Sequence, residues 1–165
     1  MATLATLEDL YIEQLQDLYS AEQQILKALP KMASAASAPE LKKAFEKHLT
    51  QSQEHLNRLD RVLKMHNKSG AGKTCKAMQG LIAEGDELMK TKADPSVMDA
   101  GLIASAQRVE HYEMAGYGCV RTWAHLLGFS EAETILQTTL DEEGKTDQDL
   151  TALAERVINV EAAAR

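Results

Sequence analysis

The sequence predicts an all-α protein, built as a four-helix bundle with a short extra helix in the crossover between the second and third long helices. Apolar residues recur every three or four positions along four long segments and one short one, which is typical of amphipathic helices. Aromatic residues make up only 4% of the chain and prolines number three, a composition that favours helices over strands. The length of 165 residues is expected to form one domain covering residues 1–165.

The first two long helices are expected on either side of a short loop. Apolar positions of the first run through Leu4, Leu7, Tyr11, Leu15, Leu18, Ile25, Leu29 and Met32. Thr6 and Asp9 resemble a capping box at its start, and Pro30 is expected to kink or end it nearby. The second helix is predicted to begin near Pro39, because proline suits a first turn, and to stop in the segment 67–72, which contains two glycines.

The second half of the chain is expected to hold the short helix and two more long ones. The short helix is predicted from about Thr74 to Lys90, and the third long helix is predicted to end at Gly128, a typical residue after a helix C-terminus. Ser130 is expected to cap the fourth long helix, with Glu133 as the capping-box acid. Two short loops and one long connection predict the crossover topology of ferritin-like bundles rather than a simple up-and-down bundle.

Charge and hydropathy exclude several classes of protein. A net charge of -7 argues against nucleic acid as a partner, since phosphate binding needs clustered cations. No apolar run approaches the length of a membrane span, and residues 1–10 hold no Lys or Arg, unlike a secretory or transit peptide. Cys75 and Cys119 lie too far apart in the sequence to suggest a disulfide framework or a zinc site, and Cys119 is expected to be a small buried residue. A cytoplasmic location is the default expectation.

Polar residues interrupt the apolar stripe of every long helix. Glu22 falls on the apolar face of the first helix, and three polar residues of the second (His48, Ser52 and His55) fall on its stripe. The third helix carries Glu110 and Glu113, and the fourth carries Glu143 and Asp147. Each long helix therefore places at least one acid or potential metal ligand where a leucine would be expected.

These positions should also match in height along the bundle. The turn near residue 36 would bring Glu22 level with about residue 50, and the turn near residue 128 would bring Glu113 opposite about residue 144. Carboxylates crowded in a bundle interior repel each other unless they take up protons or a cation. Carboxylates and imidazole from all four helices form the ligand set of di-iron and di-manganese carboxylate bundles. The predicted metal ligands are Glu22, His55, Glu110, Glu113, Glu143 and Asp147.

The motif departs from the strict template, and ordinary roles remain open. The template has one Glu on each of two helices and Glu-x-x-His on the other two. The third helix has a second Glu in place of His, and the fourth has Asp147 one residue later than a His would stand. In the second helix a ligand from Gln51, Glu54 or His55 is possible. Any one of these acids alone would be typical of a helix boundary, and His48 alone is more typical of a packed or boundary histidine.

Four stretches of the chain resemble the YciE/YciF family of ferritin-like bacterial proteins. They are residues 6–33, 44–62, 106–118 and 140–154, with the combination YSAE, VEHYE and LDEEGKTD. The resemblance implies a ferritin-like bundle, a homodimer, a binuclear metal site in mid-bundle and a link to stress responses. The family's acidic pattern maps onto Glu22, Glu110, Glu113, Glu143 and Asp147. Residues 48–52 read HLTQS where relatives often read HLEET, which would weaken the site or make it mononuclear unless His55 compensates.

Three hypotheses about function follow. The first is a ferritin-like di-iron protein that oxidises Fe(II) with O2 or H2O2, with manganese or another divalent metal as the alternative cofactor. The second is a non-enzymatic helical dimer with a stress or interaction role and a vestigial or single structural metal site, which Gln51 favours. The third is iron storage in a hollow cage, which the length allows but for which the sequence offers no cage contacts.

Overall fold

The computed structural model describes residues 4–165, and all regular structure in that range is helical. The elements are α1 (Leu7–Ala35), α2 (Pro39–Met65), α3 (Lys76–Lys90), α4 (Pro95–Leu126) and α5 (Ser130–Leu153), which continues through a π-helical turn, η1 (Ala154–Ile158), into α6 (Asn159–Ala163). The predicted fold class is therefore confirmed, including the short helix in the crossover. Over the described residues, no helix has both the length and the apolar character that crossing a membrane requires.

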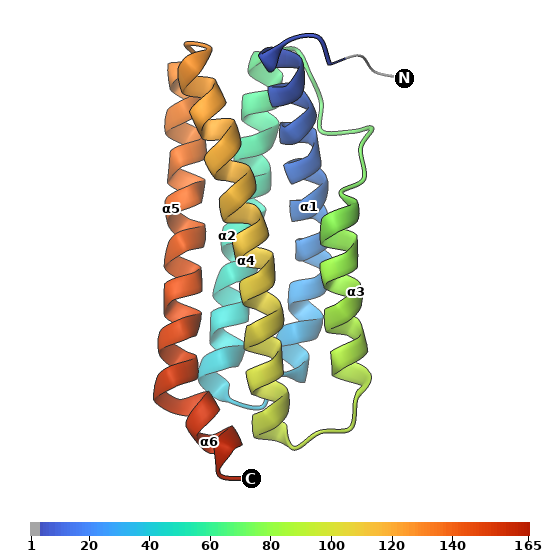
Figure 1. Cartoon of the computed structure of the whole chain (residues 1–165), viewed down its shortest axis with the longest axis vertical. Coiled ribbons are helices and arrows are strands. Elements are labelled where there is room, and N and C mark those ends of the chain that lie inside the picture. The colour runs from blue at the N-terminus through green and yellow to red at the C-terminus, as the bar shows by residue number, and fades with distance from the viewer. Residues whose placement is uncertain (1–3) are drawn as a thin grey trace.

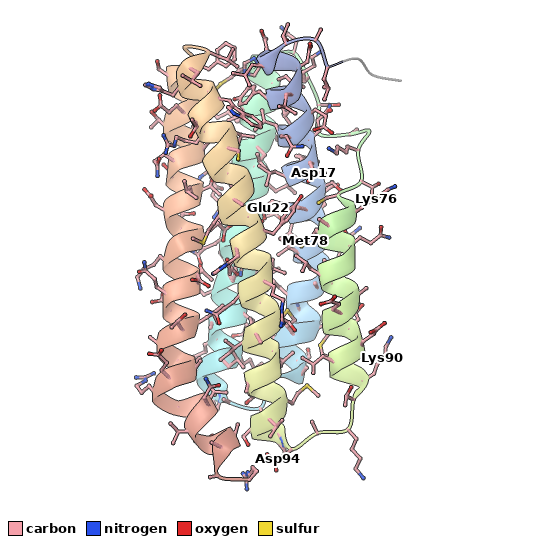
Figure 2. All side chains as sticks on the ribbon, in the orientation of Figure 1. Asp17, Glu22, Lys76, Met78, Lys90 and Asp94 are labelled. Atoms are coloured by element: carbon pink, nitrogen blue, oxygen red, sulfur yellow. The ribbon has the colours of Figure 1, made fainter. Side chains whose placement is uncertain are left out.

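Four long helices stand side by side, and the short helix lies against one edge of the bundle (Figure 1). α1 packs on α2, and α4 packs on α5. Contacts of α1 with α4 and of α2 with α5 close the bundle, while α3 covers α1 and α4. α2 and α4 run in the same direction, so the chain between them must return along the length of the bundle (Figure 1). Figure 2 marks the two ends of α3 by Lys76 and Lys90, on this return path.

Local sequence signals explain most helix ends. The Thr6 hydroxyl accepts the Asp9 N–H, and the Asp9 carboxylate accepts the Thr6 N–H, which forms the expected capping box. Proline occupies the first turns of both α2 and α4, where its missing N–H costs nothing. Gly128 follows α4 with φ +78°, a conformation that glycine adopts without a steric penalty.

α1 continues through Pro30 and ends at Ala35. Two other predictions about local structure were wrong. Ser130 is not the cap of α5, because Phe129 is the N-cap residue and no side chain caps this end. The carboxylate of Glu133 instead lies 3.1 Å from Nδ1 of a histidine in α4. Cys119 is exposed rather than buried.

The core consists of two apolar clusters, one toward each end of the bundle. On α1, the first cluster contains Ile25 and Leu29, and the second contains Leu15 and Leu18. Between the clusters lies a layer of buried polar side chains from all four long helices, namely Glu22, His48, Ser52, His55, Glu110, Glu113 and Glu143. The candidate site is therefore enclosed by apolar packing above and below.

Candidate metal centre

Six buried ionisable side chains from the four long helices form the polar layer. α1 provides Glu22, which lies about midway along the bundle (Figure 2). α2 provides His48 and His55, α4 provides Glu110 and Glu113, and α5 provides Glu143. Each is at most 2% exposed. The pairs on α2 and α4 are seven and three residues apart, spacings that put both members on one helix face.

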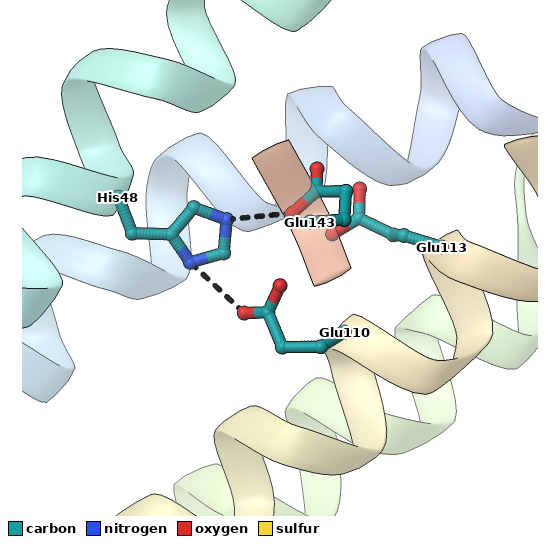
Figure 3. Close-up of side chains that lie close together, drawn as sticks. All are labelled: His48, Glu110, Glu113 and Glu143. Atoms are coloured by element: carbon teal, nitrogen blue, oxygen red, sulfur yellow. Dashed lines mark ion pairs between the residues drawn. The ribbon is translucent and has the colours of Figure 1, made fainter. Parts of the chain in front are cut away.

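The first potential metal site is formed by His48, Glu110, Glu113 and Glu143, each of which offers one ligand atom within 4.8 Å of the others. His48 Nδ1 lies 3.0 Å from Glu110 Oε1, and His48 Nε2 lies 3.5 Å from Glu143 Oε2. Figure 3 shows the imidazole and the three carboxylates turned toward a common centre. Three helices thus contribute to this group.

The second potential site is formed by Glu22, His55 and Glu143, again with ligand atoms within 4.8 Å of one another. His55 Nδ1 lies 2.7 Å from Glu143 Oε1 and 3.4 Å from Glu22 Oε1. Glu143 belongs to both groups, with Oε2 on the side of His48 and Oε1 on the side of His55. The two sites are therefore adjacent and share one carboxylate.

Side chains outside the second group hydrogen-bond to its members and fix their orientation. Tyr117 donates its hydroxyl proton to Glu22 Oε1 at 2.7 Å. His55 Nε2 lies 2.7 Å from Glu142 Oε2, and Arg58 donates to both oxygens of Glu142, at 2.7 and 3.1 Å. In a neutral imidazole, a carboxylate that accepts the outer N–H leaves the inner nitrogen without a proton and free to bind a metal. Here that inner nitrogen is Nδ1 of His55.

The pKa values of five of these groups show how poorly this layer tolerates full ionisation of its carboxylates. Burial raises the pKa of Glu110 to about 8, and burial together with neighbouring carboxylates raises the pKa of Glu113 well above its ordinary value. Burial opposes the charged forms of His48 and His55, yet the adjacent carboxylates outweigh it and raise both pKa values, that of His55 to about 10. Burial likewise opposes ionisation of Glu143, but the two histidines hold its pKa below its ordinary value. The layer favours added positive charge, whether as protons or as a cation.

Unpaired polar atoms indicate which form of positive charge the layer fits. Several buried ligand atoms lack a hydrogen-bond partner, namely both oxygens of Glu110, Glu113 and Glu143, Glu22 Oε2, His48 Nε2 and His55 Nδ1. Some of these atoms lie within ion-pair distance of each other but without hydrogen-bond geometry. Leaving such atoms unpaired in an apolar interior costs a few kcal/mol each. Divalent iron or manganese, which take carboxylate and imidazole ligands, fit this donor set.

The structure brings together five of the six residues predicted as ligands and leaves out Asp147. Asp147 Oδ1 accepts a hydrogen bond from Gln107 Nε2 at 3.0 Å and lies 3.2 Å from Nε2 of the exposed His111. On α5, the next buried residue after Glu143 is Thr146. Residue 147 is therefore turned toward the flank of α4.

On α2, the structure places two histidines in the layer and no carboxylate. The amide oxygen of Gln51 is buried without a hydrogen-bond partner. Glu54 is exposed, with Arg58 as its ion-pair partner at 3.8 Å. Sequence reasoning underrated His48, which is only 2% exposed and belongs to the first group. Its signal was the seven-residue spacing to His55, which places both imidazoles on one face two turns apart.

Comparison with known proteins gives close relatives over nearly the whole chain. The family model "Domain of unknown function (DUF892)" matches residues 6–163. Protein YciF of Escherichia coli (strain K12) is 42% identical over 160 residues, which is 96% of each chain. The crystal structure of the E. coli stress protein YciF matches with a TM-score of 0.91 and 43% identity, over 94% of this chain and 99% of that one. YcfI from Rhodopseudomonas palustris, described as a proposed structural protein, matches with a TM-score of 0.86 and 43% identity over 88% and 93% of the two chains.

Proposed function

Because this chain belongs to the DUF892 family and is a close relative of the stress protein YciF, we propose that it is a ferritin-like di-iron protein that oxidises Fe(II) with O2 or H2O2 in a bacterial stress response. The observation that carries the proposal is the position of Glu143, whose two oxygens serve two adjacent groups of buried ligands. The proposal includes a cytoplasmic location and a homodimer.

Each ion would have its own ligands and share Glu143. His48, Glu110 and Glu113 would hold one ion, and Glu22 and His55 the other, with manganese or another divalent metal able to use the same donors. When bound, the two irons supply two electrons to the oxidant. With H2O2, two Fe(II) and two protons give two Fe(III) and two waters; with O2, they give two Fe(III) and one H2O2.

Charge balance supports two divalent ions. Four carboxylates, from Glu22, Glu110, Glu113 and Glu143, carry four negative charges when ionised, and two divalent cations neutralise them with both imidazoles uncharged. Without metal, the raised pKa values of Glu110, Glu113, His48 and His55 mean that these groups take up protons instead. Metal binding therefore exchanges protons for cations in a layer with no access to bulk water, where uncompensated charge is strongly disfavoured.

Aerobic Fe(II) titration of the metal-free protein tests the proposal. We expect about two irons per chain and faster oxidation than in buffer alone. A Glu143→Gln variant should lose at least one ion per chain and most of the acceleration. The matched control is Glu155→Gln, an exposed acid in η1, the turn that continues α5. Failure of the unmodified protein to bind about two irons, or to speed their oxidation, would remove the proposal.

The second candidate is a non-enzymatic stress or interaction protein with at most one structural ion. Two observations favour it. The layer can balance its charges internally, because His48 and His55 lie against the carboxylates, and the relative from R. palustris is described as a proposed structural protein. Elemental analysis of protein purified without chelator, alongside a Glu113→Ala variant, would support this candidate if it found at most one ion per chain. Sedimentation analysis distinguishes a dimer from a cage.

A further inference from the structure

A small cavity lies between α1, α3 and α4 and ends against the metal centre. Its free volume is about 30 Å³. α1 contributes Ile25, Ala28, Leu29 and Met32, α3 contributes Leu81, Ile82, Gly85, Asp86 and Met89, and α4 contributes Ser105, Ala106 and Val109. His48 and Glu110 complete the wall. The cavity therefore connects the crossover helix to two members of the first ligand group.

The cavity wall is apolar except at its two ends. Most of the lining is aliphatic or thioether carbon, and the metal-centre end alone offers buried charged groups, at His48 and Glu110. On the outer side, Asp86 is partly exposed and pairs with Lys31 across α1 and α3 at 3.3 Å. Gly85 is buried on α3 facing α4, and its missing side chain helps to leave the space open.

The size and the lining point to one kind of occupant. A volume near 30 Å³ accommodates a molecule of one or two heavy atoms. Water and H2O2 would lose hydrogen bonds against an aliphatic wall, whereas an apolar diatomic molecule loses none. We propose that this cavity admits O2 to the metal centre, so that O2 is the oxidant that arrives by this route. The inference rests on the proposed function and assigns a role to α3, whose residues form the outer wall.

Two substitutions on α3 make a matched pair for testing the cavity. A Cβ added at Gly85 would have Ser105 Cβ at 3.9 Å as its nearest neighbour, which is ordinary contact, so a side chain can start there and occupy the cavity. A Cβ added at Gly80 would meet nothing within 4 Å, and Gly80 is exposed and absent from the lining. Gly85→Val should fill the cavity, whereas Gly80→Val should change only the exposed surface of the same helix. Ala28→Leu, from the opposite wall, is the second filling variant if Gly85→Val fails to fold.

Two measurements follow the occupant and the reaction separately. Crystals pressurised with xenon, which binds dry apolar cavities, should show xenon in the cavity of the unmodified protein and of Gly80→Val, but none in Gly85→Val. In oxidation assays, Gly85→Val should raise the KM for O2 several-fold, while Fe(II) stoichiometry and the rate with H2O2 stay unchanged.

The outcomes separate this inference from the function on which it rests. Absence of xenon from the unmodified protein overturns the cavity assignment, even if iron is oxidised normally. Unchanged KM for O2 in a filled variant, or equal slowing with O2 and H2O2, overturns the O2 route alone. If the unmodified protein neither binds nor oxidises Fe(II), the proposed function fails and the O2 route fails with it, whatever the xenon result.

Discussion

Metal-free protein should lose stability as the pH rises through neutrality, because its buried layer then has to give up protons. Glu110 has a pKa of about 8 in the folded chain, raised mainly by burial, against an ordinary value of 4.5. A raised pKa contributes stability that is fully present below the unfolded value and is lost as the pH passes the folded value. Glu113 and both histidines have shifts of the same direction, so all four groups act together.

The size of the effect follows from the linkage of protons to folding. One proton held only by the folded state changes stability by about 1.4 kcal/mol per pH unit. Glu110 alone should therefore remove roughly 2 kcal/mol between pH 6.5 and pH 8, a large part of a typical stability of about 5–15 kcal/mol. The lowered pKa of Glu143 matters only below its ordinary range. The lowered pKa of His66, caused by burial, affects stability only at the acid side of this window.

Urea denaturation of chelator-treated protein, followed by far-UV circular dichroism at several pH values, measures this dependence. The midpoint should fall from pH 6.5 to pH 8, and Glu110→Gln should flatten the curve because it removes one titrating group. Saturating divalent metal should raise stability most at the higher pH, where the ligands are deprotonated. A midpoint that stays level or rises across this range in the metal-free protein would refute the reasoning.

Three further predictions concern single side chains. Glu142→Gln should weaken divalent-metal binding about 10–100-fold, measured by calorimetry, because it loosens the orientation of His55; unchanged affinity would contradict this role. Asp99 accepts two backbone N–H groups of the α1–α2 turn at 2.8 Å each, so Asp99→Ala should lower the free energy of unfolding by about 2–4 kcal/mol in urea titrations. A Cβ at Gly116 would lie 2.7 Å from the Leu18 side chain of α1, so Gly116→Ala should lower the free energy of unfolding by about 1–3 kcal/mol. A Cβ at Gly118 would meet nothing within 4 Å, so Gly118→Ala should leave the free energy of unfolding unchanged or raise it in the same titrations.

The sequence was sufficient to predict the helices, because each helix buries one continuous stripe of side chains. Periodicity identified all four long helices and α3, and Pro39 marked the start of α2. The predicted cap at Ser130 was wrong, because the turn after α4 is closed by backbone hydrogen bonds. One of them joins the Phe129 N–H to the Ala124 carbonyl at 2.9 Å. The chain then enters α5 without needing a side-chain cap, which no local propensity rule anticipates.

For the candidate site, the sequence indicated which helices contribute but not every residue. Polar residues on apolar stripes identified the four glutamates, because each of them follows the three- and four-residue spacing of the buried positions around it. Asp147 follows Glu143 by four residues, and only the packing of α5 against its neighbours decides that Thr146 turns inward instead. His48 needed the opposing carboxylates of α4 and α5 to stand apart from an ordinary packed histidine.

The polar layer lowers the stability of the metal-free bundle, which argues that it serves binding rather than folding. Two apolar clusters already hold the ends of the four helices together, and well-packed apolar residues in place of buried charges are often neutral or stabilising. Yet the layer contains many ligand atoms without hydrogen bonds, each of them destabilising. One carboxylate, Glu143, faces both histidines, so a cation in either group would change the charge that the other group meets. Binding of the two ions should therefore be coupled, with the second ion entering a layer that the first has already deprotonated and ordered.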